Sequence, residues 1–129
     1  MPLFRCLAPA ALPLLAACST VSGQGHTAAI GQSFELTPGH SMTVADAGTL
    51  RYDALVNDSR CRPDVQCIWA GDAEVAFTWT PRSGAAEHFS LHTKPDAGSH
   101  ALADSHQVHL VSLERGDAPA ATLRVDATP

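Results

Sequence analysis

The chain has 129 residues, of which 45% are hydrophobic, and 8 Lys and Arg against 13 Asp and Glu give a net charge of −5 at pH 7. An acidic chain without a basic cluster does not attract nucleic acids electrostatically, so we exclude nucleic acid as a partner. Without an N-terminal signal, roughly 110 residues remain, enough for one domain with a single core.

The N-terminal segment has the build of a secretory signal. It carries one charge, Arg5, followed by an uncharged run from Cys6 to Ala17 that is rich in Leu and Ala. This run is shorter than the about 20 apolar residues that a membrane-spanning helix needs. It closes on Leu-Leu-Ala-Ala-Cys at 14–18, which resembles the lipobox of bacterial lipoproteins. We therefore predict a signal peptide over 1–17 and a lipid on Cys18; a buried helix, or a signal cut without lipidation, is the alternative.

Lipidation would make the membrane a partner of this chain. About three acyl chains would sit on Cys18, and two or more hold a protein stably on a bilayer. The next residue is Ser19, not the Asp typical of lipoproteins retained at the inner membrane. The resemblance thus implies an outer-membrane protein that faces the periplasm. Residues 18–32 are small, polar and Gly-containing, which predicts a flexible tether.

Beyond the tether, hydrophobic residues alternate with period two, and no segment shows a sustained helical period. The predicted strands cover residues 34–36, 42–44, 50–56, 74–80, 87–93, 107–113 and 121–125. In the third we expect Leu50, Tyr52, Ala54 and Val56 to share one face; the sixth is apolar on both faces, which predicts a central strand. The fold class is therefore all-β: an antiparallel β-sandwich, Ig-like or Greek-key, or a small barrel of about seven strands, as one domain over 33–129.

Two cysteines remain once Cys6 leaves with the signal and Cys18 carries lipid. Cys61 and Cys67 form an even pair in an oxidising compartment, which favours a disulfide. A redox-active dithiol is the alternative. Such dithiols usually place two residues between the cysteines beside a βαβ unit, and this chain has five residues between them and no such unit. We predict a structural bridge.

The segment 58–71 reads DSRCRPDVQCIWAG. It resembles the signature of a family of small, uncharacterised bacterial lipoproteins, Asp-Ser-Arg-Cys-Pro, two variable residues, Val-Gln-Cys, Ile or Val, Trp-Ala-Gly. The matching residues are Asp58, Ser59, Arg60, Cys61, Val65, Gln66, Cys67, Ile68, Trp69, Ala70 and Gly71. Arg62 stands where the family has proline, and Pro63 follows it. The resemblance implies a lipobox and an all-β fold, and it implies no activity.

Two interpretations of this segment remain open. In the first it is a corner of the scaffold: Trp69 packs over the disulfide or caps the core, and Gly71 permits the backbone geometry that starts the next strand. In the second it is an exposed, rigid loop that presents Arg60, Asp64 and Trp69 to a ligand.

Seven histidines raise the possibility of a metal site. His88 and His92 share a strand face and, with one loop histidine (His40 or His100), are candidates for binding copper or zinc. Strand residues four apart are about 13 Å apart, however, too far to share one ion without a bend. We therefore expect exposed, unpaired histidines, with no metal and no cofactor.

Catalytic signatures such as Gly-x-Ser-x-Gly and Ser-x-x-Lys are missing from the sequence. We therefore expect no enzyme but a lipid-anchored binding or structural module, with an envelope protein as a possible partner. The alternatives are an inhibitor of a periplasmic hydrolase that acts through the disulfide-closed loop, and a histidine-based metal-binding module.

Overall fold

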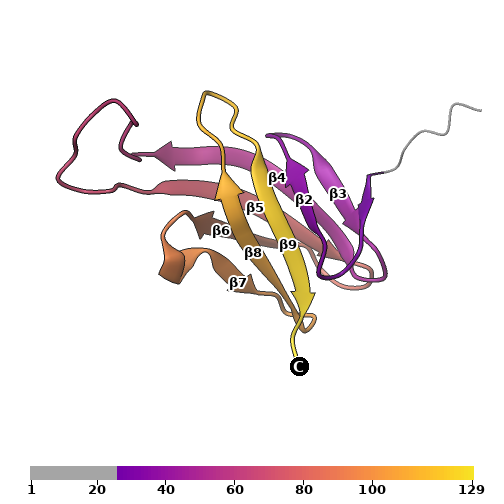
Figure 1. The fold of residues 1–129 in the computed structure, drawn as a ribbon. Helices are drawn as coiled ribbons and strands as arrows, with labels where there is room; N and C mark the ends of the chain where they lie inside the picture. The colour runs from indigo at the N-terminus through magenta and orange to yellow at the C-terminus, as the bar shows by residue number, and fades with distance from the viewer. Residues whose placement is uncertain (1–25) are drawn as a thin grey trace, which may run out of the picture.

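The computed structural model describes residues 26–129, and within them nine strands form two packed sheets (Figure 1). The first sheet has the order β1 (Thr27–Ala28), β3 (Ser41–Val44), β4 (Gly48–Asp58), β5 (Ala73–Pro81), β6 (Glu87–His92). The second has the order β2 (Ser33–Leu36), β9 (Ala121–Ala127), β8 (His106–Leu113), β7 (Ser99–Ala101), and a short 3-10 helix η1 (Pro95–Ala97) links β6 to β7. The predicted all-β sandwich is confirmed, and it is not a closed barrel. The predicted signal peptide and Cys18 lie outside the described residues.

The alternating pattern of the sequence places one side of each sheet in a shared core. The first sheet contributes large side chains that are fully buried, among them Leu50, Tyr52, Phe77, Trp79 and Leu91. The second sheet covers them with Phe34, Leu36, Val108, Leu123 and Val125. Because strand side chains alternate between faces, these residues were recognisable as core from the sequence.

The predicted inward face of β4 is wrong beyond Tyr52. The pairing with β5 shifts register between Tyr52 and Ala54, and again between Leu55 and Asn57. An extra residue in one strand reverses the alternation of its side chains. Leu55 therefore packs against the core, whereas Ala54 and Val56 are exposed.

A similar irregularity explains why β8 is apolar on both faces. Its pairing with β9 shifts between Leu110 and Ser112, so that Val108, Leu110 and Leu113 all contact the core while Val111 is exposed. The strand does lie inside its sheet, between β9 and β7, as predicted. Its apolar pattern nevertheless reflects a bulge and not burial of both faces.

Two strands, β1 and β7, lie in segments for which we predicted no strand. Thr43 N donates to His26 O at 3.0 Å and Ala45 N donates to Ala28 O at 2.8 Å, which adds β1 to the first sheet in parallel with β3. Ala28 is buried, so the domain begins before the predicted boundary at residue 33. Strands of two or three residues, such as β1 and β7, are too short to produce a recognisable alternation.

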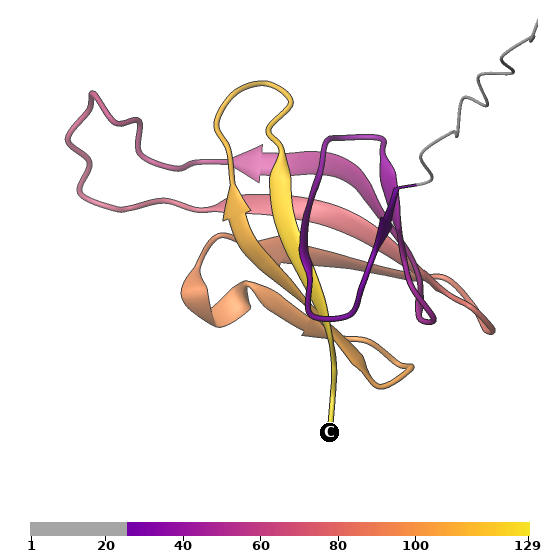
Figure 2. The same ribbon diagram turned by 45° about the vertical axis from the view of Figure 1, so that its right-hand side comes forward.

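The N-terminal strand β1 and the loop that follows β4 lie at opposite ends of β4. Thr27 pairs with Thr43, which pairs with Thr49 near the start of β4. Asp58 is nine residues further on, which corresponds to about 30 Å along a strand. Figures 1 and 2 show the 59–72 loop at the opposite end of the sandwich from β1. Among residues 26–129 there is no helix with the length and hydropathy that crossing a membrane requires.

Candidate functional site, a disulfide-closed loop

The loop over residues 59–72 continues the β4–β5 hairpin beyond the sandwich (Figure 1). Ser59 N donates to Asp72 O at 2.8 Å and Cys61 N donates to Ala70 O at 3.1 Å, so the stem of the loop keeps an antiparallel pairing. The predicted disulfide between Cys61 and Cys67 is confirmed, with 5.9 Å between the two Cα atoms. Closing so small a ring stabilises the fold by about 2–2.5 kcal/mol in the chain-entropy account.

Arg60 fastens the base of the loop to the second sheet. Its guanidinium donates from Nε and Nη2 to the two carboxylate oxygens of Asp58, at 2.9 and 2.7 Å. It also donates to the backbone oxygens of Leu113 and Glu114, at 2.7 and 2.6 Å. Only 12% of the Arg60 side chain is exposed, and four of its five N–H donors are used in these bonds, so little of the group is left for a ligand. Hydrogen bonds from Arg60, assisted by the charges of Arg60 and Arg115, hold the pKa of Asp58 below its usual range.

Asp72 fastens the other side of the base to β6. Its carboxylate lies 2.6 Å from Nδ1 of His92 and accepts hydrogen bonds from Thr93 Oγ1 and Lys94 N at 3.1 and 3.2 Å. Burial opposes ionisation of Asp72, but the bonds from His92, Thr93 and Lys94 outweigh it and lower the pKa of this carboxyl. Ser59 Oγ also bonds the Asp72 backbone across the stem.

Gly71 permits the close approach of the two stem strands. Its φ is +72°, and a Cβ at this position would collide with the carbonyl oxygen of Ser59. Both facts require glycine, because other residues carry a Cβ and avoid positive φ.

The loop exposes large apolar side chains. Ile68 is 95% exposed and Trp69 81% exposed, and Val65 is 43% exposed. The expectation that Trp69 packs over the disulfide or caps the core is therefore wrong. The buried tryptophan is Trp79, whose Nε1 donates to Asp104 at 3.0 Å.

The three residues predicted to meet a ligand do not form one cluster. Asp64 and Trp69 are exposed on the loop, whereas Arg60 belongs to its base. Two hollows flank the loop instead. One, of about 450 Å³, is lined by Ser59, Trp69, Ala70, Gly71, Asp72 and Lys94; the other, of about 320 Å³, is lined by Asp58, Arg60, Arg62, Pro63, Asp64, Arg115 and Gly116.

Sequence reasoning missed four exposed residues on the loop or beside it. Ile68 lies beside Trp69 in the motif, so its position was a signal that could have been used. Arg62 also lies within the motif segment, where it replaces the family's proline. Lys94 and Arg115 are brought to the loop by tertiary structure, and the sequence carries no signal for that.

Six of the seven histidines have a side-chain partner, contrary to the expectation of unpaired side chains, whereas His26, His40 and His88 are exposed as expected. Ring nitrogens lie within 3.2 Å of a carboxylate oxygen in the pairs His92–Asp72, His100–Glu87, His106–Asp104 and His109–Asp126. In the third pair the 3.1 Å approach lacks hydrogen-bond alignment, and both atoms are buried. His40 and His88 bond Thr37 and Thr78. Within residues 26–129, no group of three or more His, Cys, Asp or Glu residues has the geometry to hold a metal ion.

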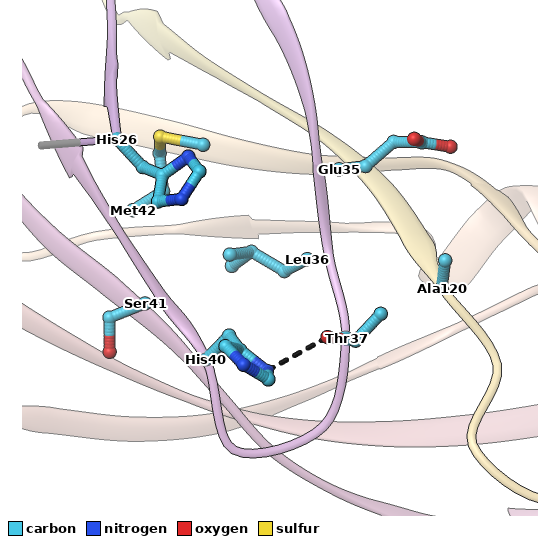
Figure 3. Close-up of a pocket in the computed structure, with 8 residues that line it drawn as sticks. All are labelled: His26, Glu35, Leu36, Thr37, His40, Ser41, Met42 and Ala120. Carbon is cyan, nitrogen blue, oxygen red and sulfur yellow. Dashed lines mark hydrogen bonds between the residues drawn. The ribbon is translucent and has the colours of Figure 1, made fainter. Parts of the chain in front are cut away.

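A further hollow of about 250 Å³ opens between β2 and β3 (Figure 3), with Leu36, Met42 and Ala120 among its lining residues. His40 at its rim is held by Thr37, at 2.8 Å, and Figure 3 shows the Glu35 carboxylate pointing away from His26 and His40. These side chains do not converge on a common point, so the hollow offers apolar surface and no ligand set.

Comparison with models of known protein families finds no match, and comparison with curated proteins and with solved structures finds none either. The function must therefore be argued from the loop itself.

Proposed function

We propose that this protein is a non-enzymatic binding module, lipid-anchored at Cys18 on the periplasmic face of the outer membrane, that binds an envelope protein through the 59–72 loop. One observation carries the proposal. Ile68 and Trp69, adjacent in sequence, are 95% and 81% exposed directly after the disulfide ring of the loop.

Single exposed apolar residues are common, but here two large ones are adjacent on a loop that a disulfide and hydrogen bonds hold in place. Tryptophan is enriched among the few residues that supply most of the binding energy of protein interfaces. The disulfide, Arg60 and Asp72 hold the loop in place, so little ordering is needed when a partner binds. This arrangement supports the interpretation of the segment as a presented loop over that of a scaffold corner.

The proposed anchor and location rest on the sequence. The lipobox ending at Cys18, followed by Ser19, and the resemblance of 58–71 to a lipoprotein signature support them. Mass spectrometry of the protein isolated from membranes tests the anchor: we expect a mature chain that begins at a triacylated Cys18. A chain with an unmodified Cys18 would contradict the proposed location.

Inhibition of a periplasmic hydrolase is a second candidate. The closed ring between Cys61 and Cys67 leaves a narrow, exposed loop, the shape that enters an enzyme cleft. A panel of periplasmic proteases and muramidases, assayed with the purified protein, tests it. Inhibition that Trp69→Ser abolishes would favour this candidate over a non-inhibitory binding role.

Photo-cross-linking in living cells tests the proposed function. A benzophenone amino acid at Gln66, in the loop, places the probe beside Ile68 and Trp69 without replacing them; the same probe at Glu35, on β2, is the positional control. We expect a discrete cross-linked protein at Gln66 only, lost with Ile68→Ser/Trp69→Ser. The matched control, Ile30→Ser/Val111→Ser, removes exposed apolar residues elsewhere and should retain it. Equal cross-linking in both double variants would contradict the proposal.

A further inference from the structure

The positively charged side chains that form no ion pair within residues 26–129 lie around the loop. Residues 26–129 contain seven Lys and Arg side chains, and four form ion pairs: Arg51, Arg60, Arg82 and Arg124. The other three, Arg62, Lys94 and Arg115, have no ion-pair partner in the described part of the chain, and all three line the two hollows beside the loop. In a chain with a net charge of −5, this placement is a local exception.

We infer that the partner presents a carboxylate-bearing segment, and that a carboxylate enters the hollow between Arg62 and Arg115 while apolar side chains contact Ile68 and Trp69. This inference rests on the proposed function and adds the chemical class of the partner.

The hollow lined by Arg62 and Arg115 lies between one segment that follows a strand of the first sheet and one that follows a strand of the second. Arg62 stands in the disulfide ring, and Arg115 stands in the turn between β8 and β9. Arg60 connects these two segments through its hydrogen bonds to the backbone oxygens of Leu113 and Glu114. These bonds hold the backbone of the two segments in place, so that Arg62 and Arg115 line one hollow, in which a carboxylate can meet the guanidinium groups.

The charge balance in the hollow is positive. Asp58 and Arg60 neutralise one another through their paired hydrogen bonds. Arg62 and Arg115 then face a single acidic side chain, Asp64. Exposed arginines at an interface rim mainly raise the association rate and select the partner's charge.

A protein carboxylate fits this surface better than a phosphate of a lipid headgroup. Asp64 in the same hollow opposes a multiply charged group, and the acidic chain as a whole is repelled by polyanionic surfaces. The same loop offers Ile68 and Trp69, which match apolar residues of a folded partner. The loop also lies at the end of β4 remote from β1, and so away from the point where the N-terminal segment joins the domain.

The first test is a titration of the full lipidated protein in zwitterionic detergent micelles, followed through the Nε–Hε signals of its arginines. The probes are the peptides acetyl-Glu-Leu-Glu-amide and acetyl-Gln-Leu-Gln-amide, and inorganic phosphate. We expect saturable shifts at Arg62 and Arg115 with the glutamate peptide, at a Kd at least about tenfold below that of the glutamine peptide. Arg51 and Arg82, exposed but ion-paired elsewhere, are the internal controls. Equal shifts with both peptides, or binding of phosphate alone, would overturn the inference.

The second test uses the cross-link at Gln66. Arg62→Glu/Arg115→Glu should lower its yield about tenfold at low salt, with a smaller effect as salt screens the charges. The matched pair Arg51→Glu/Arg82→Glu should leave the yield unchanged. If Ile68→Ser/Trp69→Ser abolishes the cross-link but the charge reversal does not, the inference fails while the proposed function stands. If neither pair matters, the proposed function itself fails.

Discussion

The guanidinium of Arg60 donates a 2.7 Å hydrogen bond to the backbone oxygen of Leu113, 53 residues further along the chain. This bond joins the end of β4 in the first sheet to the end of β8 in the second. A residue that the sequence suggested as a ligand contact thus holds the two sheets together at the base of the loop.

Arg60→Ala should lower the free energy of unfolding by about 2 kcal/mol, because it leaves Asp58 and two backbone oxygens without their charged donor. Urea denaturation measures the change. Arg51→Ala is the control: its ion pair with Asp53 is exposed, so the loss should stay within about 0.5 kcal/mol. Equal losses in the two variants would show that the Arg60 contacts contribute no more than a surface pair.

Removing the disulfide should weaken the loop without unfolding the sandwich. Cys61→Ser/Cys67→Ser should cost about 2 kcal/mol, because the open loop gains chain entropy in the unfolded state. The backbone amide of residue 61 donates to Ala70 in the stem, and in this variant it should exchange its hydrogen faster than in the wild type. Unchanged exchange and an unchanged denaturation midpoint would mean that the stem holds its geometry without the bridge.

The two tryptophans should respond oppositely to a fluorescence quencher. Trp69 is 81% exposed and Trp79 is 1% exposed, so acrylamide should quench only the emission of Trp69. Trp69→Phe should remove the quenchable, red-shifted component and leave stability within about 0.5 kcal/mol, since an exposed side chain is replaced. If the quenchable component persists in Trp69→Phe, the exposed tryptophan is not Trp69.

Asp72 should make the domain sensitive to acid. Hydrogen bonds lower its pKa in the folded state below the ordinary value of 3.8, so its contribution to stability is complete above the unfolded pKa and is lost as pH falls through the folded one. Asp72→Asn should therefore be less stable than the wild type at neutral pH and lose less stability between about pH 5 and about pH 2. Thermal unfolding across this range measures the slope. Asp96→Asn, an exposed residue of η1, is the control and should follow the wild-type curve.

Gly71→Ala and Gly39→Ala separate backbone strain from collision. Both glycines have positive φ, +72° and +85°, which costs alanine about 1–2 kcal/mol. A Cβ at Gly39 meets open space, whereas one at Gly71 collides with the Ser59 carbonyl. Gly71→Ala should therefore exceed Gly39→Ala by at least about 1 kcal/mol in denaturation measurements. Equal costs would mean that the stem relaxes around the added methyl group.

The sequence was sufficient for the sandwich, the core residues and the disulfide, because period-two alternation and cysteine pairing are local signals. It was insufficient where one extra residue reverses the alternation, as at Leu55 in β4 and Val111 in β8. The predicted packing of Trp69 was wrong, because an aromatic residue beside a disulfide has no local feature that distinguishes a cap on the core from an exposed position on the loop. Partners for the histidines come from distant strands, as with His109 and Asp126, and no local spacing predicts them.

The Tyr52 hydroxyl donates to the Pro119 carbonyl inside the core, on the same β8–β9 connection whose start Arg60 holds. The turn that carries Arg115 is thus tethered at both ends to strand β4 or its extension, and the disulfide ring continues that same hairpin. Free and bound states should accordingly share one backbone conformation in this region. Variants of Ile68 and Trp69 should therefore differ mainly in how long the complex lasts, whereas changes of the rim charges Arg62 and Arg115 should act mainly on its rate of formation.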